Sequence, residues 1–111
     1  MHPPESLFRK MCDRAEAVVW RFNPQNVVNM VWACARLDLR PGDALFEALC
    51  ARVDAVMRDF SPQGVANFLW ACARLEMSVS PALFGAFCGR AEAVVAGFNE
   101  QGIANYLWAC A

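Results

Sequence analysis

The chain has 111 residues, of which 58% are hydrophobic and 19% are charged, and its formal net charge is −1. This composition excludes a disordered tail, and the near-neutral charge gives no bulk reason to expect binding to nucleic acid or to an anionic membrane. No apolar run reaches the ~20 residues that a membrane-spanning helix needs, and no signal peptide is visible at the start. The length suits one modest domain.

The first predicted element is a helix from Pro3 to Arg21, because its apolar residues recur at steps of one, three or four and so share one stripe. Asn23 is expected to cap a second helix beginning at Pro24, since proline fits a first helical position. That second helix is apolar almost all the way round, which predicts burial between neighbours. A turn over residues 38–42 ends the unit.

The same plan then recurs twice. The expected helices, with their caps, are Asp43–Phe60, Pro62–Leu75 capped by Ser61, Pro81 to about Gly97 capped by Ser80, and a last helix from Glu100 capped by Asn99.

A strict period of 38 residues joins these units. Trp32, Trp70 and Trp108 are 38 residues apart without insertion, and residues 1–38 share 18 identical positions with residues 39–76. Such a period is typical of stacked repeats, in which each helical pair buries its faces against its neighbours. We therefore predict an all-α fold, an αα-solenoid of three helix-turn-helix repeats (about 1–38, 39–76 and 77–111) forming a single domain.

Two motifs carry a family resemblance. The first helix begins Pro3-Pro4-Glu5-Ser6-Leu7, and the second helix of the middle repeat reads Pro62-Gln63-Gly64-Val65-Ala66-Asn67-Phe68-Leu69-Trp70-Ala71-Cys72-Ala73-Arg74-Leu75. With the 38-residue period, they resemble the octotricopeptide repeat family, although Ser6 stands where tryptophan is common. The chain also looks like the helical repeats found beside FAST-kinase-like and RAP domains.

The resemblance implies sequence-specific binding of single-stranded RNA, an organellar transcript, in a chloroplast or mitochondrion. The role that it implies is transcript stability, processing or translation. The third repeat stops inside the recurring motif, since Ala111 aligns with Ala73, so we expect a fragment of a longer array.

An arginine recurs at one site on every first helix, at Arg14, Arg52 and Arg90. Stacking would set these side chains in a row that could follow successive phosphates. Acidic residues recur two positions later, at Glu16, Asp54 and Glu92. An alternative is therefore that ion pairs between repeats use the arginines.

Side chains that read different bases should differ between repeats. Such variable sites are Arg9, Glu47 and Gly85, then Asp13, Ala51 and Gly89, then Asn26, Gly64 and Gly102. The residues expected to bind RNA are therefore Arg9, Asp13, Arg14, Glu47, Arg52 and Arg90. An unconstrained surface would vary in the same way.

Amides and tryptophans recur on the second helices, at Gln25, Gln63 and Gln101, at Asn29, Asn67 and Asn105, and at Trp32, Trp70 and Trp108. Their strict recurrence favours asparagines buried between repeats over base-reading ones. The tryptophans could stack on bases, but their apolar helices favour a place in the core. Trp20 has no equivalent in the other repeats and is expected to be partly exposed.

The six cysteines follow the repeat at Cys12, Cys34, Cys50, Cys72, Cys88 and Cys110. They form no Cys-x-x-Cys pair and no cluster with His2, so reduced, buried thiols are expected rather than disulfides. No catalytic constellation is present, and we expect no enzyme activity, no cofactor and no metal site.

Two function classes remain. The first is an RNA-binding module, and the second is a protein-interaction scaffold that uses the solenoid surface without touching RNA. Neither involves a membrane. The end repeats lack polar caps, which predicts self-association through their apolar end faces.

Overall fold

The computed structural model describes all 111 residues, and it is all-helical. The six α-helices are α1 Glu5–Val18, α2 Pro24–Leu37, α3 Asp43–Val56, α4 Pro62–Arg74, α5 Pro81–Ala93 and α6 Glu100–Cys110. A short 3₁₀ turn follows each first helix, at Val19–Arg21, Met57–Asp59 and Val95–Gly97. The predicted all-α solenoid of three helical pairs is confirmed.

The four expected side-chain caps are also confirmed. Asn23 and Asn99 accept hydrogen bonds of 2.7 Å from the backbone N–H groups of Asn26 and Gly102. Ser61 and Ser80 accept bonds of 3.0 and 3.1 Å from Gly64 and Leu83. Each cap satisfies a backbone N–H that has no partner within its helix, which fixes where that helix begins.

The first helices of the repeats are shorter than expected. The expected bounds Pro3–Arg21, Asp43–Phe60 and Pro81–Gly97 merged an α-helix with the 3₁₀ turn that follows it. At Val56 the backbone leaves the α-helical region (φ −111°), and Phe60 is extended (φ −71°, ψ 130°). Apolar residues continue through the turn, so hydrophobic spacing alone could not reveal the break.

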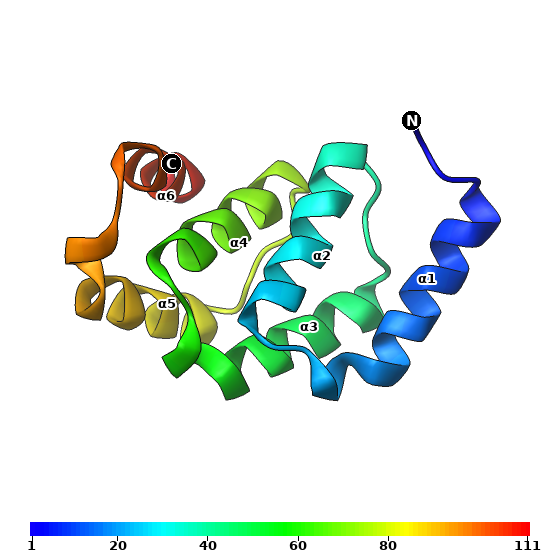
Figure 1. Cartoon of the computed structure of the whole chain (residues 1–111), viewed down its shortest axis with the longest axis horizontal. Helices are drawn as coiled ribbons and strands as arrows, with labels where there is room; N and C mark the ends of the chain where they lie inside the picture. Colours follow the sequence, from blue (N-terminus) through cyan, green and yellow to red (C-terminus); the bar gives the residue numbers. More distant parts are fainter.

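The six helices form two layers along the long axis of a molecule measuring 41 × 27 × 21 Å. The second helices α2, α4 and α6 pack side by side in one row, and α1, α3 and α5 follow one another in the other row (Figure 1). The two termini lie toward opposite ends of the array (Figure 1). None of the helices combines the length and hydropathy that a membrane crossing requires.

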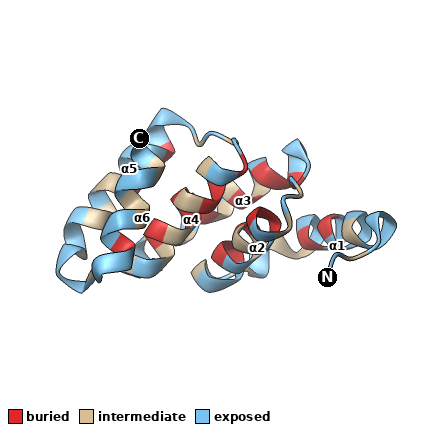
Figure 2. Cartoon of the chain, turned by 90° about the horizontal axis from the view of Figure 1, so that it is seen from above, coloured by how far each residue is buried: buried red, intermediate tan, exposed pale blue.

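The core lies between the two rows and is best closed in the middle of the array. Phe60, Phe68 and Phe87 are fully buried and touch one another, with ring centroids 5.3–6.4 Å apart. Buried residues gather on α2, α3 and α4, whereas α5 and α6 are largely exposed (Figure 2). An end repeat has only one neighbour, so part of its apolar stripe stays in solvent.

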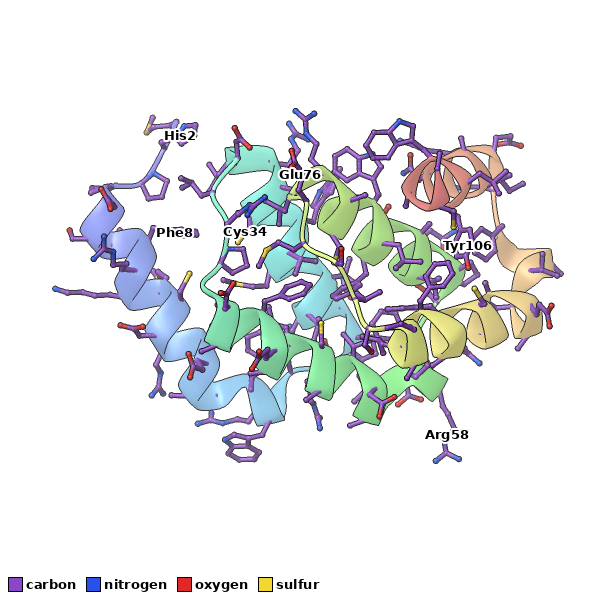
Figure 3. The ribbon with its side chains drawn as sticks, turned by 180° about the vertical axis from the view of Figure 1, so that it is seen from behind. His2, Phe8, Cys34, Arg58, Glu76 and Tyr106 are labelled. Carbon is purple, nitrogen blue, oxygen red and sulfur yellow. The ribbon has the colours of Figure 1, made fainter.

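All six cysteines are free thiols, as expected. Cys12, Cys34 and Cys72 are buried, and Figure 3 shows Cys34 within the packed helices. The expectation of burial is wrong for Cys110, which is exposed near the end of α6. Its equivalent Cys72 is covered because another helical pair follows it.

Candidate nucleic-acid interface

The arginine row on the first helices joins successive repeats. Arg52 donates its Nε–H to the carbonyl oxygen of Phe22 at 2.7 Å, and Arg90 donates likewise to Phe60 at 2.9 Å. Each acceptor follows a 3₁₀ turn, where the extended backbone leaves its carbonyl without a helical partner. A guanidinium makes a strong, charge-assisted bond with such an oxygen.

The expected ion pairs between these arginines and the acidic row do not form. The ion pairs in the structure are Arg9–Glu5, at 2.7 Å within α1, and Arg40–Glu76, at 3.9 Å. Arg14 is exposed and has no hydrogen-bond partner, because no repeat precedes it in the structure. The alternative of an ion-pair row is therefore wrong.

The variable sites on the first helices all lie on the surface. Arg9, Asp13 and Glu47 are exposed, as are their equivalents Ala51, Gly85 and Gly89. Arg9 is held by Glu5 of the same helix, and the alanine and glycines offer no polar side chain. The third set, Asn26, Gly64 and Gly102, donates backbone N–H groups to the helix caps. These residues therefore have a local structural role.

The second helices α2, α4 and α6 present a further repeated surface of amide, tryptophan and arginine residues. Gln25, Asn29, Trp32 and Arg36 follow at steps of four, three and four residues, so they share one face of α2. The equivalent residues are Gln63, Asn67, Trp70 and Arg74 on α4, and Gln101, Asn105 and Trp108 on α6. All eleven are exposed or half-buried, and we call them the second-helix face.

This face corrects two expectations. The second helices are not buried all round, since Gln25, Asn29 and Arg36 are exposed on α2. The asparagines are not buried between repeats either, because Asn29 is exposed and Asn67 is half-buried. The row of second helices is covered by the first-helix layer on one side only, so its opposite side meets solvent.

The tryptophans of this face form a row across the repeats. The ring centroids of Trp32 and Trp70 are 4.9 Å apart and tilted by 54°, and those of Trp70 and Trp108 are 6.3 Å apart and tilted by 41°. Trp108 is 54% exposed, and the other two are half-buried. The guanidinium of Arg36 lies 5.6 Å from the centre of the Trp32 ring. The expectation that the tryptophans belong to the core holds in part: the half-buried Trp70 packs against the core, whereas Trp108 is exposed. Trp20 is 67% exposed, as expected.

A polar groove of about 450 Å³ separates the N-terminal halves of α2 and α4. The amides of Gln25, Asn29, Gln63 and Asn67 line it, together with the carboxylate of Asp59. None of the four amide side chains has a hydrogen-bond partner within the protein. Amides can both donate and accept, and the positive ends of two helix dipoles lie beside them.

At the junction between the second and third repeats, the backbone at Gly97 lies against Pro62. A Cβ atom on Gly97 would lie 2.9 Å from Cγ of Pro62, a distance that carbon atoms do not tolerate. The equivalent residue at the previous junction is Asp59, whose side chain lines the groove. Glycine at this one position therefore lets the third repeat pack closer to the second.

The chemistry of the second-helix face suits a polymer of repeating units. Each repeat offers an amide pair and an aromatic ring, and the first two add an arginine at the end of the stripe. These groups can donate and accept hydrogen bonds, stack on planar rings and pair with anions. Fold and face together define a helical repeat protein with a periodic surface of amides, aromatic rings and arginines.

A family assignment follows from comparison with known proteins. The model of the family described as RNA-editing substrate-binding complex 6 protein matches residues 3–78, and the chain belongs to this family. The match spans the first two repeats, and the third carries the same pattern. No curated protein matches the sequence. The octotricopeptide and FAST-kinase-like likenesses remain resemblances, while the expectation of an RNA-associated helical family is supported.

Proposed function

We propose that this chain is a single-stranded RNA-binding module that acts within an RNA-editing complex, and that its second-helix face receives the RNA. The observation that carries the proposal is the repetition of one stripe of amides, tryptophan and arginine on neighbouring helices. The family name supplies the context, since it refers to an RNA-editing substrate-binding complex.

Stacking provides the main attraction in this proposal. An aromatic ring that stacks on a base contributes about 1–3 kcal/mol, whichever base it is. Trp108 is 54% exposed, and Trp32 and Trp70 are half-buried, so part of each side chain is open to solvent. At one base per repeat, the array would hold about three nucleotides.

The polar groups would hold the sugar and phosphate groups. Arg36 and Arg74 are exposed at the ends of their stripes, where a guanidinium can pair with a phosphate. The groove amides can bond ribose hydroxyls or base edges. With two arginines engaged, we expect a shallow salt dependence, with a slope of log K against log salt of about −1.4.

The proposed module binds RNA with little sequence preference, because the stripe is the same in every repeat and discriminates little between bases. The variable residues of the first helices, including Arg9, Asp13 and Glu47, lie on the other layer of the array and do not face RNA held on the second helices (Figure 1). Sequence-specific recognition of the kind that the octotricopeptide resemblance implies would require RNA on the first-helix layer instead. The proposed module performs no catalysis, needs no cofactor and works in a mitochondrion; the family match gives no support for a chloroplast.

The proposal is tested by measuring the fluorescence anisotropy of labelled, randomised single-stranded RNA at two salt concentrations. The critical variant is Arg36→Glu with Arg74→Glu, on the second-helix face. The matched control is Arg14→Glu with Arg58→Glu, which changes net charge equally on the first-helix layer. Figure 3 shows Arg58 projecting away from the second helices.

We expect the critical variant to lose binding at least tenfold and the control to stay within about twofold of the wild type, because like charge repels phosphate only where phosphate is held. The reverse result would place the RNA on the first-helix arginines, as the expected set including Arg14 requires. No binding by the folded wild type would favour the protein-interaction scaffold.

A further inference from the structure

The polar groove between α2 and α4 contains one charged group that does not belong to the repeated stripe. Its lining includes the carboxylate of Asp59, which ends the 3₁₀ turn Met57–Asp59 just before α4. The equivalent residues in the other repeats are Arg21 and Gly97. Asp59 therefore distinguishes this junction from the next one, in a molecule whose amides and tryptophans are the same in every repeat.

The carboxylate of Asp59 is available to a ligand. It is exposed, it accepts no hydrogen bond within the protein, and it takes part in neither of the two ion pairs. The adjacent Arg58 projects away from the second helices (Figure 3) and forms no ion pair with it. Because the four groove amides are without partners as well, every polar side chain of α2 and α4 that lines the groove can bind a guest molecule.

The charge of this groove decides which part of an RNA strand fits it. A carboxylate repels phosphate, and no lysine or arginine lines the groove to offset that repulsion. Groups that donate hydrogen bonds are attracted instead, and in RNA these are the ribose hydroxyls and the base edges. The volume of about 450 Å³ lies within the range of about 300–1,000 Å³ that is typical of small-molecule sites. The groove therefore has room for one unstacked base.

Guanine has the donor pattern that matches a carboxylate best. On its Watson–Crick edge the ring N–H and the exocyclic amino group point the same way, so each can donate to one carboxylate oxygen. Adenine and cytosine carry a bare ring nitrogen beside the amino group, and its lone pair would face that of an oxygen. Uracil has a single N–H between two carbonyl groups. Guanine alone makes two such bonds without repulsion.

We propose that the groove between α2 and α4 is a guanine-selective site, in which Asp59 accepts both bonds from one unpaired guanine of a bound RNA. The inference rests on the proposed function, because the strand must lie on the second-helix face. The groove amides can bond the remaining carbonyl group of the base or its ribose. The next junction lacks the carboxylate, and a side chain at Gly97 would collide with Pro62. The preference therefore applies to one nucleotide, while the stripe accepts any base.

The test measures the anisotropy of labelled twelve-nucleotide RNAs with the full chain. Four of these RNAs alternate uridine with guanosine, inosine, adenosine or cytidine, and the fifth contains uridine only. Inosine is the matched probe, because it differs from guanosine only in lacking the exocyclic amino group. A two-bond contact discriminates between bases by about tenfold, and half of the registers of an alternating RNA place guanine in the groove. We therefore expect about fivefold tighter binding of the guanosine RNA than of each of the others.

The critical variant is Asp59→Asn, which keeps the shape of the side chain and replaces one acceptor oxygen by a donor group. It should bind the guanosine and inosine RNAs within about twofold of each other. The control is Asp54→Asn, which removes the same charge from an exposed position of α3 and should keep the wild-type preference. Comparing RNAs within one protein cancels the general gain in affinity that the loss of a negative charge brings.

The outcomes separate this inference from the function on which it rests. A wild type that binds all five RNAs equally would overturn the guanine site and leave RNA binding on the second-helix face intact. A guanosine preference that survives in Asp59→Asn would overturn it too, since the selection would then lie elsewhere. Displacement of the RNA by an equal concentration of guanosine monophosphate would assign the groove to a free nucleotide instead. If the folded wild type binds no RNA, the proposed function and the site fail together.

Discussion

Two acidic residues occupy a backbone conformation that glycine usually takes. Asp38 and Glu76 end the second helices of their repeats with φ of 56° and 57°. The N–H groups of Asp38 and Leu39 bond back to the carbonyls of Ala35 and Cys34 at 3.2 and 3.0 Å, which closes the helix end. A side chain in this left-handed region costs about 1–2 kcal/mol.

Replacing Asp38 by glycine should therefore raise the free energy of unfolding by about 1 kcal/mol, since glycine adopts this conformation without strain. Urea denaturation followed by circular dichroism measures the change. The control is Ala33→Gly, the same type of substitution in the exposed middle of the same helix, which should lower stability by about 1 kcal/mol. Equal effects of the two changes would contradict the strain argument.

The buried thiols predict a dependence of stability on alkaline pH. Burial is the main cause that raises the pKa of Cys34 and of Cys50 from 9.0 to about 11, and burial raises that of Cys72 as well. In the unfolded chain these thiols ionise near pH 9, while the folded chain keeps them protonated. Their contribution to stability is thus complete below pH 9 and is lost as the pH rises toward 11.

Urea midpoints measured from pH 7.5 to 10.5 should stay level at first and then fall above pH 9. The variant Cys34→Ala with Cys50→Ala should show a shallower fall, although its stability at pH 7.5 will be lower because a buried and a half-buried side chain have been shortened. A midpoint that rises above pH 9 would show that the thiolates are stabilised in the fold.

The roles of individual residues could be predicted where they depend only on neighbouring residues in the sequence. Asn23, Ser61, Ser80 and Asn99 were identified as caps because a short polar side chain before a helix has few other roles. The left-handed Asp38 was not foreseen, because no glycine marks it. The bonds of Arg52 and Arg90 were missed for another reason: their acceptors are backbone carbonyls, which have no signature in the sequence.

At the scale of the element, the first helices α3 and α5 are each bonded to the preceding repeat by one arginine. The bond from Arg52 to Phe22 spans thirty residues, as does that from Arg90 to Phe60. Both arginines are partly buried, so water competes little for the carbonyl. Arg14 has no counterpart of this bond within one chain.

The variant Arg52→Ala should therefore lower the free energy of unfolding by about 1.5–3 kcal/mol, the range for a hydrogen bond to a charged group. Arg14→Ala, which removes the same side chain from the same site of the first helix, should change it by less than about 0.5 kcal/mol. Both values come from denaturation of dilute, monomeric protein. A cost for Arg14 as large as that for Arg52 would show that the carbonyl bond contributes little.

Helices and their order could be predicted, but not which of their faces meets solvent. Trp32, Cys34 and Asn29 recur with equal fidelity, although Cys34 is buried and Asn29 is exposed, since a repeat preserves its core and its surface alike. Their positions on the helix distinguish core residues from surface residues only when the packing of the neighbouring helices is known. Strict recurrence predicts burial of the asparagines, but the structure shows that it marks a repeated surface.

At the scale of the whole molecule, the middle repeat has two neighbours and each end repeat has one. In a stacked array, stability is roughly the sum of unit and junction terms. The fully buried large side chains lie chiefly on α2, α3, α4 and the part of α5 that enters the second repeat. The ends of the array therefore open at lower cost than its middle.

Amide hydrogen exchange should report this gradient. We expect the slowest exchange in α3 and α4 and the fastest in α1 and α6, because local opening at an end breaks only one junction. Peptide-resolved mass spectrometry on dilute protein measures it. Uniform protection along the chain would instead indicate a single cooperative unit.

The tryptophan row also gives the molecule an optical property. Its rings lie 4.9 and 6.3 Å apart and are mutually tilted, so the electronic transitions of adjacent indoles must couple. Coupled chromophores in a chiral arrangement give paired circular-dichroism bands whose strength depends on separation and angle. Stretching, bending or twisting between repeats would therefore change the near-ultraviolet circular-dichroism spectrum, so this spectrum reports the repeat geometry without any added label.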